Sequence, residues 1–159
     1  HIYLRGFDRS LSSMENAAII VVLDNDQRDV EKFRQDLEQV AKESLMFTDH
    51  VFCIAVKEME AWLLGDEEAI EKAYPMIKNK YLKNYEQDGI CDTWEVLANM
   101  VYPGGLSGLR KKSKSSYSET GKAKCEWADK IGRELILENN ISPSFRKLLS
   151  ALQIRIEAA

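Results

Sequence analysis

The sequence predicts an α/β fold in which a parallel-sheet core is followed by a mainly helical C-terminal region. Two apolar runs, residues 17–23 (AAIIVVL) and 51–56 (VFCIAV), have the composition of strands, and the first suits a strand buried on both faces. The segment between them, residues 29–45, repeats apolar side chains at helical spacing. A strand, a helix and a second strand form the unit that joins parallel neighbours in a sheet. We therefore expect the carboxyl ends of both strands to share one edge.

Helical spacing of apolar residues continues beyond Lys57. It predicts helices over residues 58–64, 66–74, 93–101, 121–138 and from Ser142-Pro143 onward. Residues 111–118 (KKSKSSYS) are low in complexity and predict an exposed loop. We therefore divide the chain into an α/β core at residues 1–65 and a helical region at residues 66–159 that packs on this core.

The composition excludes several classes of protein. With 159 residues, of which 45% are hydrophobic and 30% charged, the chain is suited to one compact domain. Its net charge of -4 argues against a protein that coats nucleic acid through bulk charge, so any such contact must be local. Cys53, Cys91 and Cys125 lack the spacing of a zinc site, and we expect reduced thiols in a cytoplasmic protein. No apolar stretch approaches the ~20 residues that span a bilayer, so no membrane segment is predicted.

An acid pair follows the first predicted strand, in LDNDQRD at residues 23–29. Asp24 and Asp26 lie where open α/β sheets usually bind ligands, at the carboxyl end of a strand. Because Mg²⁺ and Mn²⁺ favour carboxylate oxygens, the pair predicts a metal site and, with it, catalytic roles for both residues. The alternative is that Asp26 or Asp29 caps the following helix, which would explain one acid but not the pair.

Two further acids, Glu58 and Glu60, follow the second predicted strand. They would emerge at the same edge of the sheet, and we expect Glu58 to be a metal ligand and Glu60 to be catalytic. Two residues apart on a helix, they point ~200° from each other, so at most one should face the acid pair. The alternative for Glu60 is a solvated acid on the surface of a helix.

Basic residues gather in LRKKSKSSYSETGKAK, residues 109–124, within an otherwise acidic chain. The cluster contains Arg110, Lys111, Lys112, Lys114, Lys122 and Lys124. Side chains of this kind neutralise backbone phosphates, and Tyr117 could stack on a base. We expect Arg110, Lys111, Lys112, Lys114 and Tyr117 to contact nucleic acid. The alternative is a solvated loop that keeps the protein soluble.

Four segments occur in an order that resembles the bacterial domain-of-unknown-function family 4276. They are LDNDQRD, VKEMEAWLLGDEEAIEKAY, YSETGKAKCEWADKI and ISPSFRKLLSAL, and they extend from residue 23 to residue 152. EAWLLGD is the most specific part, whereas a DxD pair alone is weak. The resemblance implies a Toprim-like (Rossmann-like) core related to OLD-type defence nucleases, often encoded beside an ABC-type ATPase.

The resemblance also implies roles for the acids. In Toprim domains, a glutamate at the end of an upstream strand acts with a DxD pair to hold Mg²⁺ for phosphodiester chemistry. Asp24 and Asp26 match this pair, and Glu58 and Glu60 match the family's acids before its tryptophan. Glu15 lies in a polar turn and is not assigned the role of the Toprim glutamate. Either an N-terminal strand with its glutamate is missing from this sequence, or the site lacks that residue.

The expected function is therefore a Mg²⁺-dependent (or Mn²⁺-dependent) nuclease or nicking subunit, set in phage defence with an ATPase partner. A non-catalytic regulatory partner of an ABC-type ATPase is the alternative, in which the acids are remnants. A third reading is a haloacid-dehalogenase-like phosphatase with Asp24 as nucleophile, although Gln27 and Arg28 depart from that family's pattern. Metal binding separates the first two readings, and an aspartyl-phosphate at Asp24 would identify the third.

Overall fold

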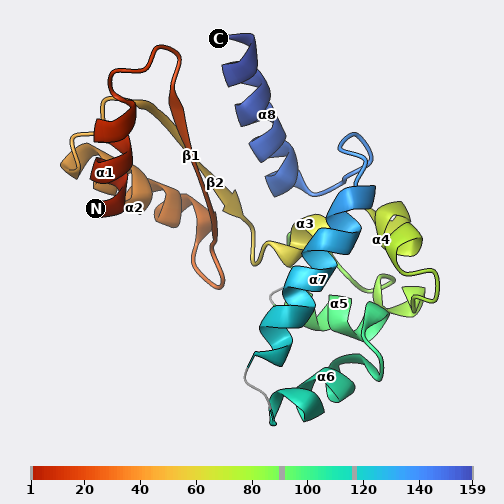
Figure 1. The fold of residues 1–159 in the computed structure, drawn as a ribbon. Coiled ribbons are helices and arrows are strands. Elements are labelled where there is room, and N and C mark those ends of the chain that lie inside the picture. The colour runs from red at the N-terminus through yellow and green to blue at the C-terminus, as the bar shows by residue number, and fades with distance from the viewer. Residues whose placement is uncertain (1, 90–91, 116–117, 159) are drawn as a thin grey trace.

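The structure is a computed structural model that describes residues 2–89, 92–115 and 118–158 (Figure 1). Its elements in chain order are α1 (Ile2–Leu11), β1 (Ala18–Asp24), α2 (Val30–Glu43), β2 (Asp49–Ala55), α3 (Glu60–Leu64), α4 (Glu67–Ala73), the 3₁₀ turn η1 (Asn79–Tyr81), α5 (Thr93–Val101), α6 (Gly105–Ser113), α7 (Glu119–Glu134) and α8 (Pro143–Glu157). The fold is mixed α/β, with a small sheet and many helices, as the sequence predicts.

The two strands form a parallel pair joined by α2. The register places Ala18 opposite Asp49 and Asp24 opposite Ala55, so both strands end at the same level. The expectation that the first strand is buried on both faces is wrong. In β1 only Ile19 is buried, and Val22 is 39% exposed. β2 is the better covered strand because α8 packs against it.

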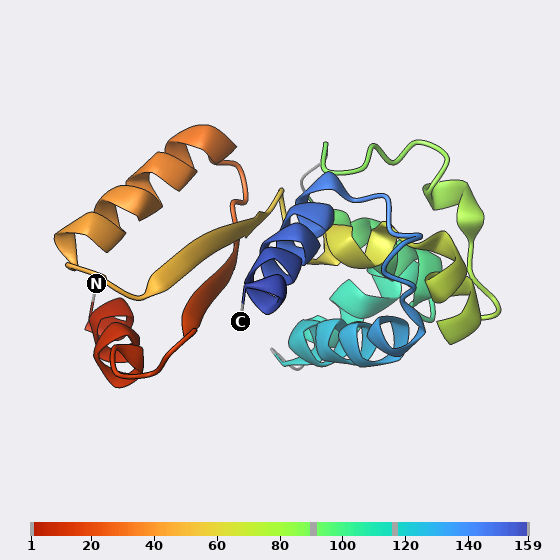
Figure 2. The same cartoon turned by 90° about the horizontal axis from the view of Figure 1, so that it is seen from above.

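Helix α1 was not predicted from the sequence. It lies on the opposite side of the sheet from α2, with the strands between them (Figure 2). The buried carboxylate of Asp8 accepts hydrogen bonds from the backbone N–H groups of Phe47 (3.0 Å) and Thr48 (2.8 Å). Arg5 also donates to the carbonyl of Glu43 at 2.9 Å. These polar contacts fix α1 beside the segment that leads into β2.

The helical region has its own apolar core. Leu97 of α5, Leu109 of α6 and Ile131 of α7 are fully buried in it, together with Ile70 of α4. Trp127 of α7 contributes the largest buried side chain and is 2% exposed. Because α3 contacts α4, α5 and α7, this core begins almost directly after the second strand.

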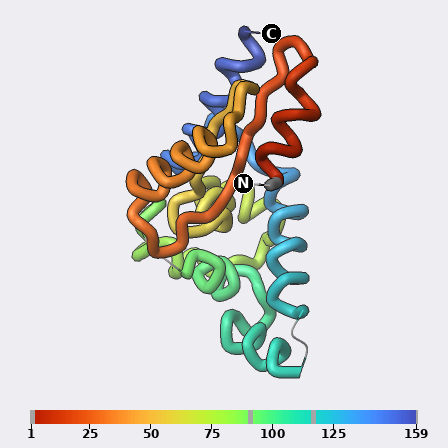
Figure 3. Tube along the Cα trace, turned by 90° about the vertical axis from the view of Figure 1, so that its left-hand side faces the viewer, coloured from red at the N-terminus to blue at the C-terminus, as the bar shows by residue number. Residues whose placement is uncertain are grey.

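Helix α8 returns from the helical region to the sheet (Figures 1 and 3). Phe145 packs with Trp62 and Ala55 in a small apolar cluster. The indole N–H of Trp62 donates to the buried hydroxyl of Ser144 at 2.8 Å. Helix α8 therefore contacts β2, while the division at residue 65 and the packing of a separate helical region on the core stay predictions.

The predicted loop at residues 111–118 is wrong in its first part. Lys111, Lys112 and Ser113 belong to α6. The helix is held by Leu109, which is fully buried, and it begins directly after Gly104, whose φ of 79° suits glycine. A buried anchor in the middle of α6 thus extends the helix into a stretch whose composition predicts a loop.

Two remaining expectations concern thiols and membranes. Cys53 and Cys125 are free thiols, the first buried and the second exposed, and Cys91 lies outside the described residues. Within the three described ranges, no helix combines the length and the apolar character that crossing a bilayer requires.

Candidate functional site

The carboxylate of Asp24 lies beside the turn that follows β2. Its Oδ1 accepts a hydrogen bond of 2.8 Å from the backbone N–H of Met59. Asp24 is the last residue of β1, and Met59 stands four residues beyond the end of β2. The parallel register therefore brings the first acid of the DxD pair against the segment that carries Glu58 and Glu60.

Asn25, between the two aspartates, joins the turns that follow the strands. Its side chain is buried, with 1% exposure. Its Oδ1 accepts the N–H of Lys57 and its Nδ2 donates to the carbonyl of Arg28, both at 2.5 Å. The backbone N–H of Asn25 also donates to the carbonyl of Ala55 at 3.2 Å. These bonds fix the acid-bearing turns relative to each other.

Asp26 has a different environment from Asp24. Its backbone has a φ of 52°, in the left-handed region, and its N–H donates to the carbonyl of Lys57 at 2.9 Å. Its exposed carboxylate forms an ion pair with Arg28 at 3.4 Å. The helix cap is Asp29, whose Oδ1 accepts the N–H of Lys32 at 2.7 Å. Capping therefore explains Asp29 and leaves the pair Asp24 and Asp26 without that explanation.

Glu58 reaches across to the start of α5. Its Oε2 accepts hydrogen bonds from the Thr93 hydroxyl at 2.6 Å and from the backbone N–H of Trp94 at 3.3 Å. A carboxylate at this position satisfies the free N–H groups of a helix N-terminus and interacts favourably with its dipole. Glu58 thus links the end of the sheet to α5.

Glu60 is paired inside the fold. Its Oε1 lies 3.0 Å from the Nζ of Lys124 on α7, and its side chain is only 11% exposed. The Nζ of Lys124 also lies 5.6 Å from the centre of the Trp94 ring, within the range of a cation–π contact. The alternative of a solvated helix acid is therefore wrong for Glu60, because the side chain is largely buried and paired.

The electrostatics at Asp24 are those of a crowded acidic site. Burial raises the pKa of Asp24 above its usual value, and the negative charges of Glu60, Asp26 and Glu58 raise it further. The N–H of Met59 acts in the opposite direction. Raised carboxylate pKa values of this origin are common where acids gather to bind a cation or to exchange protons.

Glu95 extends the acidic region along α5. Burial raises its pKa, and the charges of Asp92 and Glu58 add to this effect. Its Oε1 lies 3.4 Å from Arg110, whose charge lowers the pKa. The sequence did not point to this acid, which has no motif and lies 35 residues beyond Glu60.

The carboxylates suit a divalent cation that keeps several waters better than a cation enclosed entirely by protein ligands. Among residues 2–89, 92–115 and 118–158, no group of three or more histidine, cysteine or acidic side chains is arranged to hold a metal ion. Mg²⁺ commonly keeps several waters and uses one or two carboxylates. Asp24 and Asp26 suit this mode. Glu58 accepts two hydrogen bonds from α5, so its Oε2 is already engaged.

Three of the predicted nucleic-acid contacts share one surface. Arg110, Lys111 and Lys114 line a pocket of about 510 Å³ between α5 and α6, together with Asn99, Leu106 and Ser107. Lys112 lies apart from them, 3.9 Å from Glu119 and with its Nζ 5.5 Å from the centre of the Tyr102 ring. Tyr117 lies outside the described residues.

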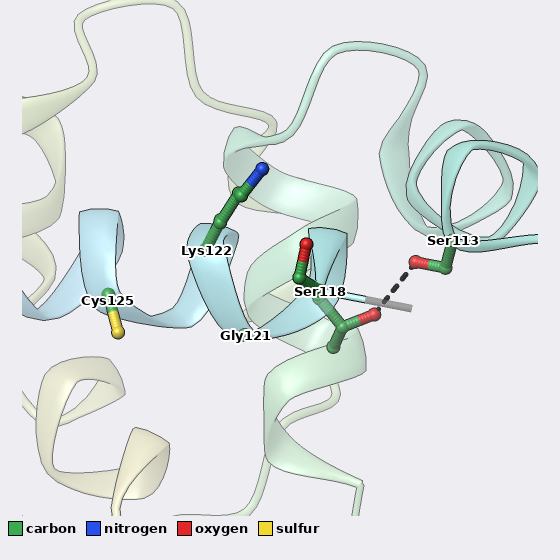
Figure 4. Close-up of a pocket in the computed structure, with 6 residues that line it drawn as sticks. Ser113, Ser118, Gly121, Lys122 and Cys125 are labelled. Atoms are coloured by element: carbon green, nitrogen blue, oxygen red, sulfur yellow. Dashed lines mark hydrogen bonds between the residues drawn. The ribbon is translucent and has the colours of Figure 1, made fainter. Parts of the chain in front are cut away.

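A second pocket lies at the start of α7 (Figure 4). It has a volume of about 840 Å³ and is lined by Ser113, Ser118, Thr120, Gly121, Lys122 and Cys125. The hydroxyls of Ser113 and Thr120 are hydrogen-bonded across it at 2.9 Å. Lys122 therefore belongs to a different surface from Lys124, although both fall in the same basic stretch of sequence.

The carboxyl end of the sheet, which carries Asp24, Asp26, Glu58 and Glu60, is called the acidic edge below. Several residues that contribute to it carried no clear sequence signal. Asn25 could have been suspected because it separates two acids, but its bonding partners could not. Thr93 and Trp94 lie in no motif that would indicate a site, and Lys124 was grouped with the basic stretch of residues 109–124 rather than with Glu60. Only the packing of α5 and α7 on α3 brings Thr93, Trp94 and Lys124 to the site.

Comparison with known proteins identifies a family. A family model described as Domain of unknown function (DUF4276) matches residues 5–153. No curated protein and no solved structure matches the chain. The matched region contains every acid and every described basic residue of the site.

Proposed function

This chain belongs to the DUF4276 family, as its ordered segments predict, and we propose that it is a Mg²⁺-dependent nuclease or nicking subunit with a Toprim-like core. The observation that carries this proposal is the environment of Asp24. This partly buried carboxylate ends a strand of a parallel sheet and is acted on by the charges of three further acids. Such a concentration of negative charge is costly unless a cation or a proton offsets it.

In this proposal, Asp24 and Asp26 hold the cation. A bound Mg²⁺ or Mn²⁺ orients water and stabilises negative charge on a phosphate. Asn25 and the Met59 N–H hold the Asp24 turn in position, which reduces the reorganisation needed on binding. Glu58 and Glu60 lie beside this pair, and their charges favour the arrival of a cation. Glu58 as a direct ligand and Glu60 as a catalytic group remain parts of the proposal.

The substrate in this proposal is nucleic acid. Arg110, Lys111 and Lys114 form the phosphate-binding surface, and Lys112 and Tyr117 remain predicted contacts on the same segment. Because these contacts are charge-based, binding should weaken as salt concentration rises and should depend little on sequence. The setting in phage defence beside an ABC-type ATPase follows from the family resemblance and is part of the proposal.

A second function is supported by the internal bonding of two acids. Glu58 is bonded to α5, and Glu60 is paired with Lys124. Both contacts would also suit a protein whose acids stabilise the fold. In that case the chain is a non-catalytic regulatory partner of an ABC-type ATPase.

Metal binding separates the two functions. We would titrate Mg²⁺ and Mn²⁺ by calorimetry into the wild type, the Asp24→Asn/Asp26→Asn variant and an Asp36→Asn control, which changes an exposed acid on α2. The same samples would be incubated with supercoiled plasmid and with single-stranded DNA and RNA. Binding and cleavage that vanish in the double variant and persist in the control would support the nuclease. A folded wild type that binds neither cation would contradict it and favour the regulatory partner.

A further inference from the structure

The acidic edge needs a positive group if it is to act on a phosphodiester. Asp24, Asp26, Glu58 and Glu60 are all acidic side chains, and each phosphate of a nucleic acid is negative. Like charges at short range repel, and the repulsion strengthens where water is partly excluded. A phosphate that approaches Asp24 therefore requires a fixed cation from the protein in addition to any metal ion.

Lys124 is suited to be this fixed cation. Lys124 forms an ion pair with Glu60, a largely buried acid among these four, whereas Arg110 pairs with Glu95 further along α5. The pair between Arg28 and Asp26 joins two mainly exposed side chains. The Lys124 side chain is 33% exposed while that of Glu60 is 11% exposed, so Lys124 is the more solvent-accessible member of the pair.

The position of Lys124 is determined by three elements. Helix α7 carries it, Glu60 on α3 pairs with it, and the ring of Trp94 on α5 lies 5.6 Å from its Nζ. The backbone N–H of Trp94 in turn donates to Glu58. The ammonium is thus oriented by the same residues that form the acidic edge, unlike a lysine on a solvated loop.

We propose that Lys124 binds a phosphate of the nucleic acid substrate at the acidic edge, a role that rests on the proposed nuclease function. An ammonium has three N–H donors. One is directed at Glu60, so the group can bind a phosphate oxygen without leaving that partner. Lys124 then lies between the carboxylates and the substrate and reduces the repulsion between them.

Neighbouring lysines do not share this position. Lys122 and Lys124 are two residues apart on α7 and therefore point ~200° from each other. Lys122 lines the pocket at the start of the helix (Figure 4). Lys130 is a matched control on the same helix, because its Nζ lies 2.6 Å from Glu126 and 5.3 Å from the centre of the Tyr74 ring.

The test measures how the binding of a fluorescent single-stranded oligonucleotide changes over a range of NaCl concentrations, with Ca²⁺ in place of Mg²⁺ to suppress cleavage. Lys124→Gln should weaken binding by about tenfold, as expected for loss of one charged hydrogen bond. It should also reduce the slope of log affinity against log salt by about 0.7, the value for one phosphate contact. Lys124→Arg should retain the wild-type slope, and Lys130→Gln should match the wild type in both quantities.

Lys124→Gln could weaken binding by leaving Glu60 unpaired and disturbing the fold, rather than by removing the phosphate contact. The Glu60→Gln/Lys124→Gln variant separates these two causes, because it removes both charges of the pair. Its oligonucleotide affinity should still be about tenfold below that of Glu60→Gln alone. Equal affinities for these two variants, or for Lys124→Gln and Lys130→Gln, would overturn the proposal for Lys124.

The two proposals fail in different ways. Wild-type protein that cleaves DNA or RNA, with affinity unaffected by Lys124→Gln, would overturn the role of Lys124 and leave the nuclease intact. Lys124-dependent binding without metal binding or cleavage would support the phosphate contact and contradict the nuclease. A wild type that binds no oligonucleotide would overturn both.

Discussion

The N–H of Met59 donates a 2.8 Å hydrogen bond to the carboxylate of Asp24, although the two residues are separated by most of the β-α-β unit. Asp24 ends β1 and Met59 follows β2. The bond therefore connects the two acid-bearing segments at the carboxyl edge of the sheet. It also stabilises the charged form of an aspartate that burial and neighbouring acids disfavour.

Asp24→Asn should increase the stability of the protein at neutral pH. The folded protein raises the pKa of Asp24, chiefly through burial, so the charged carboxylate is less favourable in the folded state than in the unfolded one. This penalty is absent at pH values below the usual pKa of 3.8 and develops as pH rises through the folded value. The asparagine removes the charge and retains an oxygen that can accept the Met59 N–H.

Urea unfolding of the wild type and the variant from pH 3 to pH 8 measures this effect. The stability gain of Asp24→Asn should disappear at the acid end, and Asp36→Asn should follow the wild-type curve. A gain of equal size at every pH would show that the charge of Asp24 is not its cause.

Asn25→Ala should destabilise the protein by about 2 kcal/mol, because two partly buried hydrogen bonds of the Asn25 side chain, with the N–H of Lys57 and the carbonyl of Arg28, are lost. Chemical denaturation measures this cost. Asn84→Ala, which changes an exposed asparagine, should alter stability by less than about 0.5 kcal/mol. A cost for Asn25→Ala no larger than that of the control would contradict a structural role for the bonds of Asn25.

Asp66→Ala should cost about 2–4 kcal/mol, since one carboxylate serves two segments. Its Oδ1 caps α4 through the Ala69 N–H at 3.0 Å, and its Oδ2 accepts the Ile136 N–H at 3.0 Å. Asp66→Asn can satisfy one of these N–H groups and should lose less stability, which thermal unfolding can resolve. Equal losses in both variants would argue that charge, rather than the number of acceptors, is what matters.

Lys114→Gln should weaken binding to a single-stranded oligonucleotide and lower the salt slope by about 0.7, because Lys114 lines the basic pocket between α5 and α6. Lys112→Gln should have a smaller effect, since Lys112 lies near Glu119 and over Tyr102. Fluorescence anisotropy over a salt series compares them. Equal effects would indicate a diffuse positive surface rather than the pocket.

Much of the secondary structure could be predicted from the local spacing of apolar residues. Residues 93–101 were predicted as a helix and form α5 with the same bounds. The β-branched runs at residues 17–23 and 51–56 lie within one or two residues of β1 and β2. Helix α6 was not predicted, because its anchor, Leu109, is buried by packing that a short window of sequence does not contain.

The sequence by itself determined the β-α-β order and the location of Asp24 at a strand end, because each depends on residues close together in the chain. The tertiary structure alone decided which partner each acid takes. Glu58 bonds to α5, and Glu60 pairs with Lys124 on α7, 64 positions further along. Such pairings depend on how helices pack and rotate about one another, and that arrangement is set by the buried apolar side chains of the whole core rather than by any local pattern.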